Sequence, residues 1–173
     1  MIEKLGHIGL TVADLERSER FYSEVFEFKA FFKIRRQSTD WLAAQVGYFT
    51  ADIEFCHMRH EAAGLHLELC KYHAPTAYYP KNDDTYVPGA SHINFWVSDA
   101  AAATERIRTY LETGGARSIG QARFMGEANN LSATMITDGP QAGGRGYYMR
   151  DPDGHTIEIW EPAKTQAASS FGK

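Results

Sequence analysis

Two histidines and two glutamates stand at matching places in the two halves of this 173-residue chain. His7 opens the segment HIGLTVAD and His92 opens HINFWVSD, at an offset of 92 − 7 = 85 residues. Glu68 and Glu158 each follow a glycine by four residues, in GLHLE and GHTIE. Imidazole and carboxylate groups are ligands that suit Zn, Ni, Co, Mn and Fe ions. The four residues are therefore candidate ligands of a divalent metal ion.

The segments that carry these residues have the β-branched and aromatic composition of short strands. Because side chains alternate between the two faces of a strand, four strands can each direct one ligand to a common centre without an HExxH motif. A lone histidine or glutamate on a strand is more often a hydrogen-bonded or solvent-facing residue. The repetition of both residue types in both halves favours a site over that alternative.

The same alternation predicts which neighbours share a face with the candidate ligands. The residues expected to do so are His66 and Cys70 beside Glu68, Trp160 beside Glu158, and Asn94 and Trp96 beside His92. His155 has an odd separation from Glu158 and is expected to point the other way. Four histidines fit no ligand spacing and are interpreted as surface and edge residues: His57, His60, His66 and His73.

Each repeated segment is expected to be a strand that leads into a helix. Asp14 and Asp99 end the two segments and are suited to cap a helix N-terminus, where a carboxylate accepts a hydrogen bond from a free N–H group. Apolar residues recur at helical spacing after both, and Gly114 ends the second helix. Residues 29–36 and 41–49 are interpreted as further strands of the first half.

The repeat also sets the expected domain organisation. Gly89, just before the second copy, marks the boundary between a first module at 1–88 and a second module at 89–162. The small and polar residues 163–173 are expected to form a flexible C-terminal tail. The stretch 117–146 is rich in glycine and is interpreted as a loop that covers the site as a lid.

Composition excludes several classes of protein. Hydrophobic residues make up 43% of the chain and the net charge is −4, which indicates a globular protein without a general basic field for nucleic acid or anionic lipid. Two cysteines, Cys56 and Cys70, lie 70 − 56 = 14 residues apart and form no CxxC pair, so they indicate neither a disulfide scaffold nor a zinc ribbon. We expect no signal peptide and a cytoplasmic location. Lys33, Arg35 and Arg36 form the densest basic patch, either a solvated face or a contact for an anionic substrate tail.

Four segments together resemble the vicinal oxygen chelate superfamily, which includes glyoxalase I, methylmalonyl-CoA epimerase, extradiol dioxygenases and the bleomycin and fosfomycin resistance proteins. They are HIGLTV at His7, LEL around Glu68, SHINFWV around His92, and DPDGHTIE, which ends at Glu158. The resemblance extends from about Leu5 to Pro162. It implies an α+β fold of two βαβββ modules that form a cupped mixed sheet around a metal site, with His7, Glu68, His92 and Glu158 at the four metal positions.

Two residues point to different branches of that superfamily. Glu68 at the second metal position resembles glyoxalase I and the epimerases, whereas extradiol dioxygenases resemble a His-His-Glu set. Tyr148, ten residues before Glu158, lies in a segment similar to the dioxygenase signature, but no histidine occurs between His92 and His155. Tyr148 is therefore either an ordinary strand aromatic or a catalytic residue.

The resemblance implies a metal-dependent lyase or isomerase of glyoxalase type. A small substrate with adjacent oxygens would chelate the metal, and Glu158 or Glu68 would remove a proton to give an enediolate. The alternatives are an Fe(II) ring-cleavage dioxygenase that uses His7, His92, Glu158 and Tyr148, and a resistance protein that binds an antibiotic without chemistry. We expect a homodimer, with the site formed within one chain or across two, and neither a nucleic acid nor a membrane as partner.

Overall fold

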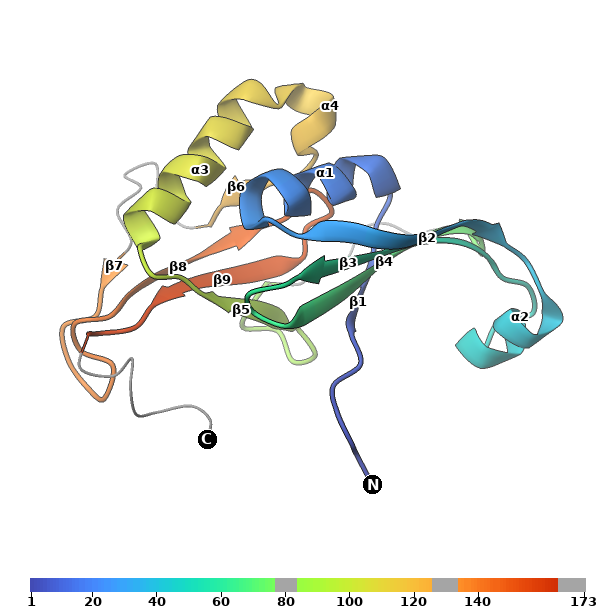
Figure 1. Ribbon diagram of the computed structural model, residues 1–173, viewed down its shortest axis with the longest axis horizontal. Coiled ribbons are helices and arrows are strands. Elements are labelled where there is room, and N and C mark those ends of the chain that lie inside the picture. Colours follow the sequence, from blue (N-terminus) through green and yellow to red (C-terminus); the bar gives the residue numbers. More distant parts are fainter. Residues whose placement is uncertain (77–83, 126–133, 165–173) are drawn as a thin grey trace. The chain divides into compact units, whose positions relative to one another are not determined.

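The computed structural model describes residues 1–76, 84–125 and 134–164 (Figure 1). The chain divides into two compact units, Met1–Lys81 and Asn82–Lys173, and each is described separately below. No helix among the described residues is both long and apolar enough to cross a membrane.

The first unit forms one sheet of four strands in the order β1-β4-β3-β2. Strand β1 is parallel to β4, and the other neighbours are antiparallel. In chain order the elements are β1 (Ile8–Thr11), α1 (Leu15–Phe26), β2 (Lys29–Gln37), α2 (Asp40–Val46), β3 (Asp52–His60) and β4 (Leu65–Ala74).

The second unit repeats this plan. Strands β5, β9, β8 and β6 are neighbours in that order, and β7 also pairs with β8. Strand β5 is parallel to β9, as β1 is to β4. The elements are β5 (His92–Trp96), α3 (Ala100–Thr113), α4 (Gly115–Ile119), β6 (Arg123–Phe124), β7 (Thr134–Met135), β8 (Arg145–Arg150) and β9 (Thr156–Glu161). The predicted α+β fold of two βαβββ modules is confirmed.

Alternation along the closing strand of each unit separates core from site. Leu67 and Leu69 are fully buried on either side of Glu68, and Ile157 and Ile159 are fully buried on either side of Glu158. Helices α1 and α3 pack on these sheets and supply further buried side chains, from Phe21 in α1 to Ile107 in α3. The glutamates therefore point to the opposite face of each strand from the core residues that anchor them.

The predicted helix caps are confirmed in both units. Asp14 Oδ1 accepts a hydrogen bond from the backbone N–H of Arg17 at 3.1 Å. Asp99 Oδ1 accepts from the N–H groups of Ala101 and Ala102, both at 2.9 Å. Each repeated segment therefore ends by satisfying N–H groups that the first turn of a helix cannot pair internally.

The interpretation of residues 41–49 as a strand is wrong, because α2 occupies most of that stretch. Thr39 caps this helix by accepting from the N–H of Leu42, and Gly47 ends it with a left-handed φ of 79°. The apolar residues of the stretch therefore follow a helical period: Leu42, Ala43 and Val46 pack into one cluster. A Thr cap and a closing glycine are the local signals in the sequence that indicate a helix here.

The stretch 117–146 is not a continuous loop. It includes most of α4, the short strands β6 and β7, and the start of β8, while residues 126–133 lie outside the described residues. The lid function stays a prediction. The predicted tail also lies outside the described residues from 165 onward, although Ala163 before it is buried.

Replacing either capping aspartate by alanine should destabilise its unit. Asp14→Ala and Asp99→Ala should each lower the free energy of unfolding by about 1 kcal/mol, because N–H groups at the helix start lose their acceptor. Urea denaturation followed by circular dichroism measures this change. Asp138→Ala, at an exposed position outside the helices, is the matched control and should change the unfolding free energy by less than about 0.5 kcal/mol.

Candidate functional site

In the first unit, His7 and Glu68 are brought together by parallel strand pairing. Gly9 of β1 lies opposite Glu68 of β4, and His7 precedes Gly9 by two residues. The two side chains therefore share a face and meet diagonally, with His7 Nε2 3.4 Å from Glu68 Oε2. The Glu68 side chain is partly buried and that of His7 is more exposed, so the pair is accessible from one side.

The second unit places His92 and Glu158 in the same relation. Asn94 of β5 lies opposite Glu158 of β9, and His92 precedes Asn94 by two residues. His92 Nε2 is 3.2 Å from Glu158 Oε2. The sequence repeat is thus a repeat of geometry, with one imidazole and one carboxylate adjacent in each unit.

Each pair offers one imidazole nitrogen and one carboxylate oxygen, two donor groups that bind divalent metal ions. Two ligand atoms that each lie about 2.1 Å from one ion are roughly 3.0 to 3.4 Å apart at octahedral to tetrahedral angles, and both nitrogen–oxygen separations fall in that range. Within the parts of the chain that the structure describes, no group of three or more His, Cys, Asp or Glu side chains is gathered as a metal site. Each unit places two of the four candidate ligands side by side.

A second histidine, His57, contacts Glu68, and its interpretation as a surface or edge residue is therefore wrong. His57 lies opposite Glu68 in the register of β3 with β4, and its Nε2 is 3.3 Å from Glu68 Oε1. Its side chain is only 16% exposed. The signal in the sequence is the hairpin: pairing His60 with Leu65 across the turn at 61–64 also pairs His57 with Glu68.

The Gly6 carbonyl, His66 and His57 form a hydrogen-bonded chain, and His57 also lies beside Glu68. His66 Nδ1 lies 3.1 Å from the carbonyl oxygen of Gly6 and must donate to it, so the neutral ring accepts at Nε2. That atom lies 3.1 Å from His57 Nδ1, which donates. Burial lowers the pKa of His57, while the Glu68 carboxylate acts in the opposite direction. The prediction that His66 shares a face with Glu68 is confirmed. His66 contacts His57, and His57 in turn contacts Glu68.

The Cys70 thiol is a further neighbour of Glu68, as predicted from strand alternation. Its Sγ lies 3.4 Å from Glu68 Oε2, and burial, with a smaller effect of Glu68, raises its pKa to about 12. The group is therefore a protonated thiol that donates to the carboxylate and is poorly suited to act as a thiolate ligand.

Tyr148 occupies in the second unit the position that His57 occupies in the first. It lies opposite Glu158 in the register of β8 with β9 and hydrogen-bonds to its carboxylate. Its ring packs edge-on against His92, with 5.4 Å between ring centroids. Burial, and to a lesser degree Glu158, raises the pKa of the Tyr148 phenol. The structure thus brings Tyr148 into contact with both members of the pair.

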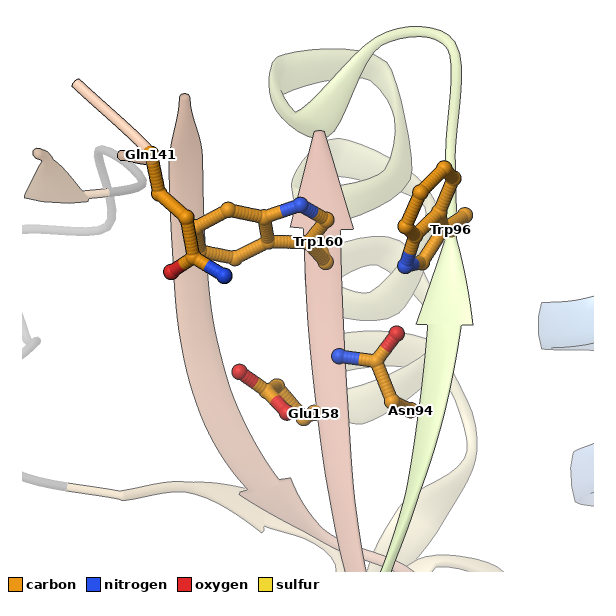
Figure 2. Close-up of a pocket in the computed structure, with 5 residues that line it drawn as sticks. All are labelled: Asn94, Trp96, Gln141, Glu158 and Trp160. Atoms are coloured by element: carbon orange, nitrogen blue, oxygen red, sulfur yellow. The ribbon is translucent and has the colours of Figure 1, made fainter. Parts of the chain in front are cut away.

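A cavity of about 440 Å³ opens beside Glu158 within the second unit. Figure 2 shows the residues that line it, Asn94, Trp96, Gln141, Glu158 and Trp160. The predicted shared face of Asn94, Trp96 and Trp160 is confirmed. His155 does not line this cavity and lies just before β9, where its backbone N–H donates to Asp151 Oδ1.

The turn before β9 is held by buried charges. Asp151 is fully buried, and its Oδ1 accepts hydrogen bonds from the backbone N–H groups of Asp153 and His155. Arg150 Nη1 donates to the carbonyl oxygen of Gly154 at 2.9 Å and to the hydroxyl of Thr156 at 2.5 Å. The DPDG segment is thus a rigid turn that sets where β9, and with it Glu158, begins.

The basic patch of the first unit is engaged in ion pairs. Lys33 Nζ lies 2.6 Å from Glu19 Oε2, and Arg36 Nε lies 2.8 Å from Asp52 Oδ1. These contacts favour the interpretation of the patch as a solvated face over that of an anion-binding site.

Hydrogen bonds to the backbone fix opposite tautomers for two histidines. His66 should be protonated at Nδ1, because that atom faces the Gly6 carbonyl, whereas His60 should be protonated at Nε2, because its Nδ1 accepts from the N–H of Ala63 at 3.1 Å. Long-range ¹H–¹⁵N correlation spectra at about pH 8.5, above the ordinary titration range of imidazole, measure this directly. His57→Phe should leave the tautomer of His60 unchanged. An Nε2-protonated His66 would contradict the hydrogen-bonded chain.

Comparisons with known proteins agree with this geometry. The chain is 28% identical over 156 residues to a 2-epi-5-epi-valiolone epimerase from an Actinomyces species, covering 88% of this chain and 76% of that protein. The fold of the chain is similar to that of a glyoxalase family protein from Bacillus cereus, with a TM-score of 0.68 and 16% identity. The match covers 94% of this chain and 96% of that one.

A second solved structure with this fold contains a metal. The fosfomycin resistance protein FosX from Listeria monocytogenes, complexed with Mn(II) and sulfate, matches with a TM-score of 0.53 and 19% identity, over 98% of this chain and all of that one. The model of the Glyoxalase/Bleomycin resistance protein/Dioxygenase superfamily matches residues 4–118, about two-thirds of the chain. With the repeated βαβββ modules and the paired ligand types described above, this match shows that the chain belongs to that superfamily.

Proposed function

We propose that the protein is a divalent-metal-dependent isomerase or lyase that moves a proton on the carbon beside a carbonyl group. The observation that carries the proposal is the diagonal contact between a histidine and a glutamate on paired strands. The Nε2–Oε2 distance is 3.4 Å in the first unit and 3.2 Å in the second. The similarity to an epimerase favours the isomerase branch. The substrate is a small molecule with adjacent oxygens, and 2-epi-5-epi-valiolone is the first to test.

The candidate ligands of the metal are His7, Glu68, His92 and Glu158. Their two imidazoles and two carboxylates suit Zn, Ni, Co, Mn or Fe, and the fold of the Mn(II)-containing FosX supports a metal of this kind. A bound divalent cation would supply Lewis acidity that polarises the carbonyl and makes the neighbouring C–H bond more acidic.

We assign proton transfer first to Glu158, because it lines the cavity and Tyr148 donates a hydrogen bond to it. Glu68 is contacted by His57 on one oxygen and by His7 and Cys70 on the other. Epimerisation requires a proton to leave one face of a carbon and return to the other, which two carboxylates on separate strands are suited to perform. In this proposal Glu68 is the second acid–base group, and Tyr148 orients Glu158.

The contact of Tyr148 with His92 and Glu158 supports a second candidate function. A ring-cleavage dioxygenase would use His7, His92 and Glu158 to hold Fe(II) and Tyr148 as an acid–base group. Its chemistry consumes dioxygen, whereas proton transfer does not. Sequestration of an antibiotic in the cavity, without chemistry, is the outcome expected if neither activity is present.

Metal content tests the ligand set. His7→Ala and His92→Ala should each reduce bound metal to below about a tenth of the wild-type content, because three-ligand remnants bind divalent ions much more weakly. Elemental analysis after dialysis against Zn²⁺ or Mn²⁺ measures this. His155→Ala, which changes a histidine outside the cavity, is the matched control and should keep full occupancy. Full occupancy in His92→Ala would exclude the assignment.

Mixing the two histidine variants also identifies which chains supply the pairs. We expect a homodimer, and size-exclusion chromatography with light scattering measures the mass. If each site combines residues of two chains, mixed dimers of His7→Ala and His92→Ala contain one intact site and regain metal. If each site lies within one chain, the mixture stays empty. Recovery in the mixture therefore separates the two arrangements.

Hydrogen exchange tests the reaction class. Under argon, the metal-loaded protein should exchange a C–H hydrogen of 2-epi-5-epi-valiolone for deuterium from the solvent. Glu158→Gln should slow this exchange at least about 100-fold. The matched control is Glu54→Gln, since Glu54 forms a His–Glu pair with His73 at 2.9 Å outside the repeat. Oxygen uptake with a catechol that depends on Fe(II) and is abolished by Tyr148→Phe would overturn the proposal in favour of the dioxygenase.

A further inference from the structure

The cavity in the second unit has a flat aromatic wall that two glycines make possible. Trp160 lies opposite Gly146 in the register of β9 with β8. A Cβ atom on Gly146 would lie 2.7 Å from Cε3 of Trp160, and one on Gly144 would lie 3.1 Å from its Cζ2. The first distance is shorter than a Cβ contact allows and the second is a tight contact, so the glycines, Gly146 above all, leave the room in which the indole lies across β8. Figure 2 shows this ring spanning from β9 toward Gln141.

The corresponding corner of the first unit is filled by protein. Cys70 follows Glu68 by two residues, as Trp160 follows Glu158. Cys70 packs in an apolar cluster with Leu42 and Ala43 of α2. The duplication thus has one corner closed by its own side chains and one that is open and lined by aromatic rings.

The groups around the open corner suit a ring that carries several hydroxyl groups. Trp96 and Trp160 are directly paired across β5 and β9 and offer aromatic faces to C–H groups. The Asn94 and Gln141 amides both donate and accept hydrogen bonds, and the Glu158 carboxylate accepts them. Among the described residues that line the cavity there is no lysine or arginine, so nothing there recognises a phosphate or carboxylate. A neutral ligand fits this lining best.

We infer that this corner is the subsite for the carbon ring of the substrate, and that the substrate is a neutral, polyhydroxylated six-membered cyclic ketone. Trp160 stacks on one face of the ring, and Asn94 and Gln141 hydrogen-bond its hydroxyl groups. The ring is thereby held against Glu158, which transfers the proton. This inference rests on the proposed function for the reaction, but the binding of the ring needs only residues of the second unit.

Ring binding is measured without metal, so that failure of the metal site does not affect the result. The probe is 2-keto-myo-inositol, titrated in the presence of EDTA into ¹⁵N-labelled protein. The three indole N–H signals, assigned with the Trp41→Phe, Trp96→Phe and Trp160→Phe variants, report the contact. The signals of Trp96 and Trp160 should shift, and that of Trp41, on α2 of the first unit, should not.

Affinity of the variants tests the role of the stacked ring. Trp160→Phe should weaken binding at least fivefold, and Trp41→Phe should leave it unchanged. Gly146→Ala, whose new Cβ displaces the indole, should weaken binding to a similar degree while the near-ultraviolet circular dichroism changes. Cyclohexanone, which lacks the hydroxyl groups, should bind at least tenfold more weakly than the keto-inositol.

Each of the following outcomes would overturn the inference. The first is unchanged affinity in Trp160→Phe, and the second is equal shifts for all three tryptophans. The third is Trp160-dependent binding of catechol at least as tight as that of the keto-inositol, which would assign the corner to an aromatic ligand. Metal-dependent exchange without ring binding would refute this subsite alone, whereas ring binding without exchange would refute the proposed reaction alone.

Discussion

Parallel pairing of the opening and closing strands is the constraint on which each unit depends. It places a residue on the first strand opposite the glutamate of the last, so that the histidine two positions earlier meets the carboxylate diagonally. The same pairing buries the residues that flank each glutamate, Leu67 and Leu69 in one unit and Ile157 and Ile159 in the other. Core and site are thus alternate faces of one strand. A slip of one residue would exchange them, which ties the chemistry to the stability of the fold.

The two units share this frame but surround the glutamates with different chemistry. Glu68 has an imidazole opposite it, in His57, and a buried thiol beside it, in Cys70. Glu158 has a phenol opposite it, in Tyr148, and an open corner lined by Trp160. The two glutamate side chains are about equally exposed, at 19% and 18%, but only the second lines the cavity described above. Equivalent positions of the two repeated units thus carry different side chains around the same glutamate.

Residues that follow strand period and helix caps could be predicted from the sequence alone. The alternation around Glu68 and Glu158, the caps at Asp14 and Asp99, and the shared face of Trp160 required only local patterns. Residues 41–49 hold helix α2 in place of the expected strand, and the Thr39 cap and the closing glycine are the local signals in the sequence that indicate it. His57 was missed because its contact depends on the register of a hairpin, which no single strand contains. The cavity depends on Gly144 and Gly146. Their role could not be predicted, because it comes from the close approach of the Trp160 indole in the folded structure.

The buried turn at Asp151 explains what the DPDG segment contributes to the chain. Its carboxylate and the neighbouring guanidinium of Arg150 satisfy backbone groups of the turn. Selection for a well-formed hairpin is therefore enough to preserve the DPDG residues in a related protein whose metal ligands have changed. A sequence search that relies on this segment recovers proteins with a common architecture whatever they catalyse. Sorting such proteins by activity requires the residues on the glutamate-bearing face of the closing strand, which is opposite to its core face.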